Sequence, residues 1–166
     1  MGRAAIQYLK TGEKRQGGST ITMQVARNFF LSSEKTFVRK FRELVLALII
    51  EQKLSKNEIL ELYLNKIFLG HRAYGVGAAA QVYYGKEIAD LDLAQMAMIA
   101  GLPKAPSRMN PITNPQAAKK RRLYVLDRMK KLGYISKKEF DVATTSAVTA
   151  KWHGYSSEVS APYVAE

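Results

Sequence analysis

The sequence contains no cysteine and only two histidines, so several kinds of chemistry are excluded from the outset. Without cysteine there is neither a disulfide framework nor a thiolate metal site, and the redox compartment stays open. His71 and His153 are too few and too scattered for a histidine metal cluster. The apolar run at residues 44–50 has seven residues, whereas about 20 are needed to span a bilayer. No signal peptide or membrane span is recognisable, and a helical pattern follows Met1 at once, which suggests a piece of a longer chain.

Negative charge is also scarce. The 166 residues include 26 Lys and Arg against 14 Asp and Glu, a formal net charge of +12. Such an excess indicates an anionic partner: nucleic acid, acidic lipid headgroups or a phosphorylated substrate. The length suits one domain with a hydrophobic core, and an apolar fraction of 47% is ordinary for a globular protein.

Alternating strand patterns are missing, whereas helix start signals recur along the chain. Three capping-box pairs are present: Ser55 with Glu58, Asp92 with Gln95, and Ser136 with Glu139. Ser19 or Thr20 can cap a helix to about residue 31, and Asn114-Pro115 opens another. Four of the five prolines lie in residues 102–115, which predicts an irregular loop. The fold class predicted is all-α.

Residues 39–51, R-K-F-R-E-L-V-L-A-L-I-I-E, predict the central helix. A helix that is apolar on all sides must be buried, so we expect a core helix whose first turns reach a charged site. Glu43 lies one helical turn from Arg39 and Lys40. Two interpretations stay open: an ordinary ion pair at a helix start, or a carboxylate with a functional role.

Four segments resemble, in the same order, the second to fifth motifs of the peptidoglycan glycosyltransferases (glycosyltransferase family 51). They are Q-G-G-S-T-I-T-M-Q-V-A-R-N at 16–28, R-K-F-R-E at 39–43, K-N-E-I-L-E-L-Y-L-N at 56–65 and R-R-L-Y-V-L-D-R-M at 121–129. The resemblance makes residues 1–145 a partial glycosyltransferase domain. Residues 146–166 then form an exit segment, in which S-A-P-Y at 160–163 is similar to the start of a connector to a transpeptidase domain. The whole resembles part of a bifunctional, class A penicillin-binding protein.

The resemblance implies a lysozyme-like helical fold, truncated at its N-terminus, that polymerises lipid II. In this reaction the 4-hydroxyl of the acceptor sugar attacks C1 of the donor with inversion, and polyprenyl pyrophosphate leaves. The implied partners are lipid II, the growing glycan strand, the membrane surface and other cell-wall synthesis proteins, with no nucleic acid. The implied location is the extracytoplasmic (periplasmic) face of the bacterial inner, cytoplasmic membrane. No cofactor or protein-held metal is required, although a divalent cation at the pyrophosphate is compatible with the chemistry.

The resemblance also assigns site residues. Arg27 and Lys35 occupy positions that contact the pyrophosphate in the family, where fixed positive charge must meet developing negative charge. Glu43 matches the family's second acidic residue, which supports the reacting groups. The remaining substrate-binding candidates are the nearby cations and the hydrogen-bonding residues of the second motif: Arg39, Lys40, Ser19, Thr20, Gln24 and Asn28.

One departure from the family is important. The first motif, E-D-x-x-F-x-x-H-x-G, supplies the general base and is absent. Glu13 lacks its aromatic and histidine context. A general base contributes about 10²–10⁴-fold to the rate, so we expect this chain alone to be nearly inactive.

Other interpretations remain for several features. Tyr63 and Asn65 are expected to have structural roles. His71 is expected to be a loop residue without a role. Arg121 and Arg122 are either solvated surface residues or a brace between helices. Three transpeptidase-like signatures stand in the wrong order and are coincidental: Ser32-x-x-Lys35, Ser55-x-Asn57 and Lys10-Thr11-Gly12. Two alternative functions are a lysozyme-like lytic glycosidase and a basic helical nucleic-acid-binding module.

Overall fold

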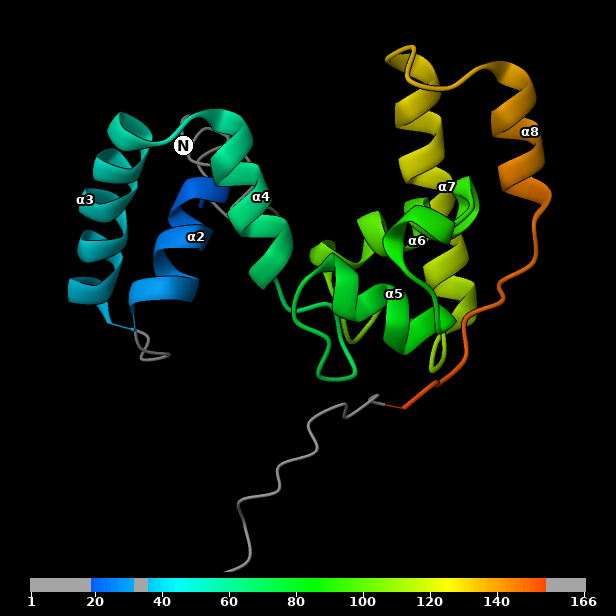
Figure 1. Cartoon of the computed structure of the whole chain (residues 1–166), viewed down its shortest axis with the longest axis horizontal. Coiled ribbons are helices and arrows are strands. Elements are labelled where there is room, and N and C mark those ends of the chain that lie inside the picture. The colour runs from blue at the N-terminus through cyan, green and yellow to red at the C-terminus, as the bar shows by residue number, and fades with distance from the viewer. Residues whose placement is uncertain (1–18, 32–35, 155–166) are drawn as a thin grey trace, which may run out of the picture. The chain divides into compact units, whose positions relative to one another are not determined.

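The computed structural model describes residues 19–31 and 36–154. It divides into two compact units, one ending at Ile67 and the other beginning at Phe68, and each is described by itself. In the described ranges all regular structure is helical, apart from one isolated antiparallel bridge between Phe68 and Tyr74 (Figure 1). The all-α prediction is therefore confirmed. None of the described helices is both long and apolar enough to cross a membrane.

The first unit contains three helices: α2 (Ile21–Phe30), α3 (Phe37–Lys53) and α4 (Lys56–Lys66). Helix α2 packs against both α3 and α4. Local sequence explains each start: Thr20 caps α2, Thr36 caps α3, and Ser55 with Glu58 forms the expected capping box of α4. The buried apolar side chains between these helices are Met23, Val25, Ala26, Ala47, Ile50, Ile59 and Tyr63.

The prediction that α3 is buried on all sides is wrong for the structure as described. Its buried residues are Glu43, Ala47 and Ile50, which are spaced so that they form one stripe. The rest of the apolar run is largely exposed, and so are the first residues of the helix: Phe37, Val38, Phe41, Leu44, Val45, Leu48 and Ile49. The physical reason is that α2 and α4 cover only one side of α3. The sequence also favours Ser32-Ser33 as the cap of this helix, but the two serines lie outside the described residues, and the N-cap of α3 is Thr36.

The second unit holds the remaining helices. They are α5 (Val76–Tyr84), η1 (Ile88–Asp90), α6 (Leu93–Gly101), η2 (Leu102–Lys104), α7 (Pro115–Lys131) and α8 (Lys137–Thr145). Helix α6 packs against α7 and α8, which lie side by side (Figure 1). A cluster of small and branched side chains fills the space between them: Ala94, Ala97, Leu126, Ile135 and Ala143. The predicted caps Asp92, Asn114 and Ser136 are all confirmed.

A buried polar network organises the proline-rich loop at residues 102–115. The Tyr83 hydroxyl donates to the Leu69 carbonyl at 2.8 Å and accepts a hydrogen bond from the Asn110 amide at 3.0 Å. The other end of Asn110, its Oδ1, accepts hydrogen bonds from the backbone N–H groups of Ile112 and Thr113. One fully buried tyrosine thereby connects α5 to a loop that has little regular structure of its own.

Arg122 is a buried brace between helices and not a solvated surface residue. Its side chain is 2% exposed, and its guanidinium donates to the carbonyls of Ser146 at 2.5 Å and Ala147 at 3.3 Å. Ser146 is the C-cap of α8, where unpaired carbonyls carry partial negative charge. Arg121 is half-buried and donates to the Gly101 carbonyl at 3.3 Å. Both arginines therefore join α7 to its neighbours.

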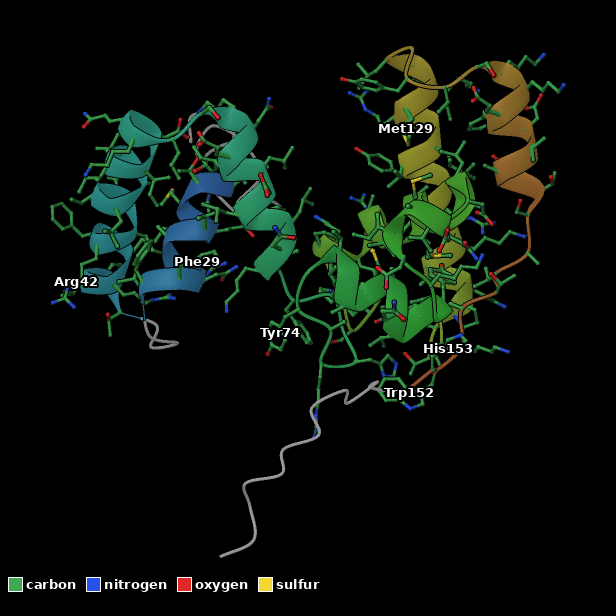
Figure 2. All side chains as sticks on the ribbon, viewed as in Figure 1. Phe29, Arg42, Tyr74, Met129, Trp152 and His153 are labelled. Carbon is green, nitrogen blue, oxygen red and sulfur yellow. The ribbon has the colours of Figure 1, made fainter. Side chains whose placement is uncertain are left out.

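Beyond α8 the chain is extended and lies along α5. The N–H groups of Lys151 and His153 donate to the carbonyls of Tyr83 at 3.1 Å and Val82 at 3.2 Å. Figure 2 labels Trp152 and His153 where this segment passes α5. The residues from 146 to Gly154 form no helix, and the boundary between a glycosyltransferase domain and an exit segment stays a prediction.

We predict that Arg122→Ala lowers the free energy of unfolding by roughly 2–3 kcal/mol. The substitution removes charge-assisted hydrogen bonds from two carbonyls at the end of a helix and leaves them without that donor. Chemical denaturation followed by circular dichroism measures the loss. Arg128→Ala is the matched control, because Arg128 is an exposed arginine on the same helix. Equal losses in the two variants would contradict the brace.

Candidate active site

A buried carboxylate lies at the centre of the candidate site. The side chain of Glu43 has 0% exposed surface and projects from the second turn of α3. The Lys40 ammonium donates to its Oε2 at 2.6 Å, and an Arg39 guanidinium nitrogen lies 3.3 Å from Oε1. Positions three and four residues apart share one face of a helix, so α3 itself brings the three side chains together. The prediction of this ion cluster is confirmed, and its burial is a finding of the structure.

Lys40 also links the cluster to α2. Its ammonium donates a second hydrogen bond, at 2.6 Å, to the Ser19 hydroxyl. Ser19 directly precedes Thr20, the N-cap of α2. The cluster of Ser19, Arg39, Lys40 and Glu43, which we call the Glu43 cluster, therefore fixes the start of α2 against α3.

The other second-motif residues follow one side of α2. Thr20 uses its hydroxyl to accept from the Met23 N–H at 3.2 Å, so its observed role is capping. Gln24 and Arg27 are half-buried, and Asn28 is exposed. Their spacing places them on the same side of the helix as Thr20. Lys35, the expected partner of Arg27 at the pyrophosphate, lies outside the described residues.

The charge of this unit suits an anion. The Glu43 cluster holds two cations and one carboxylate, so it keeps an excess of positive charge. Arg39 Nε and Glu43 Oε1 are both buried and make no hydrogen bond to the described residues, so the cluster retains one donor and one acceptor beyond those used internally. Arg27 adds a further cation in the last turn of α2. Preorganised cations of this kind stabilise negative charge that develops on a bound group.

The described residues show no fit to a metal held by the protein. No group of three or more His, Asp or Glu side chains in these ranges could hold an ion. In the Glu43 cluster the single carboxylate is already bound by two cationic side chains, and its neighbours are a hydroxyl and two cations. This donor set is unlike the oxygen-rich sites that divalent cations require.

A second polar network in the first unit was not predicted from the sequence. The Glu51 carboxylate of α3 accepts hydrogen bonds from the Thr22 hydroxyl of α2 and from the Lys56 ammonium in the first turn of α4. The hydrogen bond from Lys56, followed by that from Thr22, lowers the pKa of Glu51. Thr22 and Glu51 are 29 residues apart, and no local sequence pattern signals such a contact.

Of the two residues given structural roles, Tyr63 fits that role, and the role of Asn65 stays a prediction. Tyr63 is buried, and burial raises the pKa of its hydroxyl, whereas Asn65 is exposed on α4. His71 lies in a turn with φ of 42°, and its ring packs against Tyr83 at 5.8 Å and Trp152 at 5.2 Å. The expectation that His71 is a loop residue is confirmed, and its ring contributes to packing in the second unit.

Comparison with known proteins decides the family. A family model described as "Transglycosylase" matches residues 1–130, most of the chain. The chain belongs to the transglycosylase family. Together with the relatives described next, this match confirms the resemblance to the peptidoglycan glycosyltransferases of class A penicillin-binding proteins.

Three curated relatives are similar along nearly the whole chain. "Penicillin-binding protein 1A" of Pseudomonas aeruginosa is 58% identical over 164 residues, which are 99% of this chain and 20% of the relative. The corresponding proteins of Vibrio cholerae and Escherichia coli K12 are 59% and 57% identical over the same length, with 20% and 19% of each relative covered. The chain therefore spans about a fifth of the length of these relatives.

A solved structure supports the fold. The 2.6 Å crystal structure of Penicillin-Binding Protein 1A from Haemophilus influenzae matches with a TM-score of 0.57 and 40% sequence identity. The match covers 82% of this chain and 17% of that one. The lysozyme-like transglycosylase fold predicted from the motifs is confirmed.

We predict a specific pH dependence for Glu51→Gln. The pKa of Glu51 in the folded state lies below its ordinary value of 4.5, so the carboxylate stabilises the fold above that value. This stabilisation is lost as pH falls through the lower folded pKa. The difference in melting temperature between parent and variant should therefore be constant near neutrality and should shrink below about pH 4.

Lys56 provides the control for this pH dependence. Because the Lys56 ammonium is the main cause of the lowered pKa, most of the effect should disappear when Glu51→Gln is made in a Lys56→Met background. The same difference in melting temperature at pH 3 and pH 7 would refute the assignment.

Proposed function

We propose that this chain forms part of a peptidoglycan glycosyltransferase that polymerises lipid II into glycan strands. The observation that carries the proposal is the Glu43 cluster, in which a buried carboxylate holds two cations beside the start of α2, in a chain of the transglycosylase family. The substrate then provides the anion that the net charge of +12 requires. Lipid II, the growing strand and other cell-wall synthesis proteins are the proposed partners.

In the proposed reaction the acceptor 4-hydroxyl attacks C1 of the donor sugar as the bond from C1 to the pyrophosphate oxygen breaks. Configuration at C1 inverts, and the leaving polyprenyl pyrophosphate takes the bonding electrons. Arg27, Lys35, Arg39 and Lys40 are the cations that would stabilise this charge. The guanidinium of Arg27 adds bidentate geometry for phosphate oxygens. Ser19, Gln24 and Asn28 would contribute neutral hydrogen bonds.

Glu43 would act through its cationic neighbours. Its side chain is fully buried and already paired with Lys40 and Arg39, so the proton of the attacking hydroxyl needs another base. Restricting a long lysine side chain before the substrate arrives lowers the entropy cost of binding. Glu43 is therefore a positioning residue for Lys40 and Arg39 in the proposed mechanism.

A lipid-linked substrate also requires access to a membrane surface, and we propose that the first unit provides it. Ile21, Phe29 and Phe30 are exposed on α2, and α3 exposes the apolar residues named above. Basic residues with exposed apolar neighbours bind anionic bilayer surfaces. The sequence from Thr11 to Leu31, basic and with apolar residues beside it, also predicts a membrane-contacting lobe, and its part up to Gly18 lies outside the described ranges. The enzyme would work at the extracytoplasmic face of the bacterial inner membrane.

The first test replaces the aligned segment of Escherichia coli Penicillin-binding protein 1A, which is 57% identical over 164 residues, with this chain. In this chimera Arg27→Ala and Lys35→Ala should each raise the barrier for lipid II polymerisation by roughly 2–4 kcal/mol, the range for one preorganised donor at developing charge. Polymer formation from labelled lipid II measures the rate, and the unchanged relative sets the reference.

Arg42→Ala is the matched control for these two variants. Arg42 is an exposed arginine on α3, and Figure 2 shows its side chain directed away from α2. Its loss should change the rate less than about twofold, the size expected for one solvent-screened surface charge. Parent-level polymerisation by folded Arg27→Ala would remove Arg27 from the site. Cutting of existing glycan, without polymer, would instead indicate the lytic glycosidase.

The second test concerns Glu43→Gln in the same chimera. The amide keeps the shape of the side chain but removes the charge that holds Lys40 and Arg39, so turnover should fall at least about tenfold, or roughly 1.4 kcal/mol of barrier. Because Glu43 is buried and its amide leaves Lys40 and Arg39 without a charged partner, the melting temperature should fall as well, so turnover is compared at a temperature at which both proteins are folded. Glu61→Gln, an exposed glutamate on α4, is the control. Full activity of the folded variant would leave Glu43 with a structural role only.

The third test measures membrane contact by the first unit. Because the chain has no cysteine, Phe30→Cys can be labelled uniquely with an environment-sensitive fluorophore. Its emission should shift to the blue with vesicles, and binding should increase with the fraction of anionic lipid. Identical responses to neutral and anionic vesicles would argue against an electrostatic membrane contact.

A further inference from the structure

The turn between α7 and α8 carries two large apolar side chains that the core does not use. Leu132 is 59% exposed and Tyr134 is 76% exposed, whereas the next residue, Ile135, is buried between α6, α7 and α8. The turn is well ordered by backbone hydrogen bonds: the N–H groups of Leu132, Gly133 and Tyr134 donate to carbonyls in the last turns of α7. Leu132 and Tyr134 therefore project outward from a rigid turn.

Cations surround these two side chains. Residues 127–139 contain five cations against two carboxylates. Both carboxylates are occupied locally, since Asp127 pairs with Lys131 at 2.8 Å and Glu139 accepts from the N–H and hydroxyl of Ser136. The Lys130 ammonium lies 3.7 Å from the centre of the Phe140 ring. The remaining cations, Arg128, Lys137 and Lys138, have no carboxylate within 4 Å among the described residues.

Lys137 and Lys138 occupy positions that their own helix disfavours. They are the first two residues of α8, where the helix dipole presents partial positive charge. Two lysines there weaken the helix, so helix stability does not explain them. An anion outside the chain would reverse this cost, because it would bind the lysines and the helix N-terminus together.

We propose that this turn, with Leu132 and Tyr134 at its tip and Arg128, Lys137 and Lys138 around it, docks on a membrane surface that contains anionic lipids. Such a surface offers anionic headgroups to the cations and an apolar layer to Leu132. Tyrosine is suited to the boundary, because its ring is apolar and its hydroxyl is polar. The contact does not depend on the proposed glycosyl transfer.

The chemistry favours a membrane over other anionic partners. Protein–protein interfaces are depleted in lysine, whereas lysine dominates the cations here. A nucleic-acid backbone would satisfy the cations but would leave Leu132 in water. A lipid surface can bind the cations through its headgroups and can also bury both exposed apolar side chains.

The test uses the full chain with a single engineered cysteine, because the natural sequence has none. Tyr134→Cys is labelled with an environment-sensitive fluorophore and titrated with vesicles of phosphatidylethanolamine and phosphatidylglycerol, with phosphatidylcholine vesicles or polyphosphate in parallel. Emission should shift to the blue only with the anionic vesicles. The same label at Ile88→Cys, a half-exposed site in η1 of the same unit, should not respond.

This design separates the turn from the membrane contact proposed for the first unit. If the chain binds vesicles and the label at Phe30→Cys responds while that at Tyr134→Cys does not, the proposal for the turn is wrong. An equal response of Tyr134→Cys to polyphosphate would identify a general polyanion site and would also overturn it.

A charge-reversal pair provides the second measurement. Lys137→Glu with Lys138→Glu should weaken binding to anionic vesicles at least about tenfold, since each cation near such a surface contributes about fivefold. The same change should strengthen α8, because acidic residues suit a helix start, so unfolding cannot account for the loss. Lys119→Glu with Lys120→Glu, near the other end of α7, is the control and should weaken binding less than threefold. Equal losses in the two pairs would contradict docking by the turn.

Discussion

A carboxylate with no exposed surface stays in a protein interior only if cations or hydrogen-bond donors replace the water that it loses. Glu43 meets this requirement with Lys40 and Arg39, and the arrangement of the first unit follows from it. The cations must lie on the side of α3 that faces α2, because that is where the carboxylate is buried. Lys40 then reaches Ser19 and fixes the start of α2. The polar side of the unit is thus set by one buried charge.

In the second unit the buried charge is a cation, and hydrogen-bond acceptors replace the water that it loses. Arg122 is a buried cation, and the carbonyls of Ser146 and Ala147 at the end of α8 compensate it. By holding these carbonyls, Arg122 directs the chain back toward α5, where the backbone of Lys151 and His153 continues the contact. Glu43 and Arg122 both lie in segments that resemble family motifs, so these two motif residues carry structure as well as any function assigned to them.

Local features of the fold could be predicted from the sequence, because helix capping joins residues only three positions apart. Ser136 with Glu139 shows this in full, since both hydrogen bonds of the predicted box are present. Contacts between distant segments could not be predicted. The Thr22–Glu51 and Gln95–Thr149 hydrogen bonds join residues 29 and 54 positions apart, and nothing near either partner indicates the other.

In the candidate site, the spacing of Glu43 from Arg39 and Lys40 predicted the ion cluster, but it did not predict the link to Ser19. The prediction that the apolar run in α3 is buried is wrong for a related reason: a run of apolar residues shows what could be buried, whereas the neighbouring helices determine what is buried.

The burial of Glu43 changes how its proposed role should be understood. A surface ion pair would have been a small electrostatic addition, screened by water and salt. In the interior, the carboxylate instead fixes where two long cationic side chains lie before any substrate binds. Part of their positive charge is cancelled, which weakens attraction for a pyrophosphate in its ground state. The preorganisation remains, and it acts most strongly where negative charge increases during the reaction. A buried acid among cations is therefore compatible with anion stabilisation, because its contribution is the fixed geometry of Lys40 and Arg39 rather than its own charge.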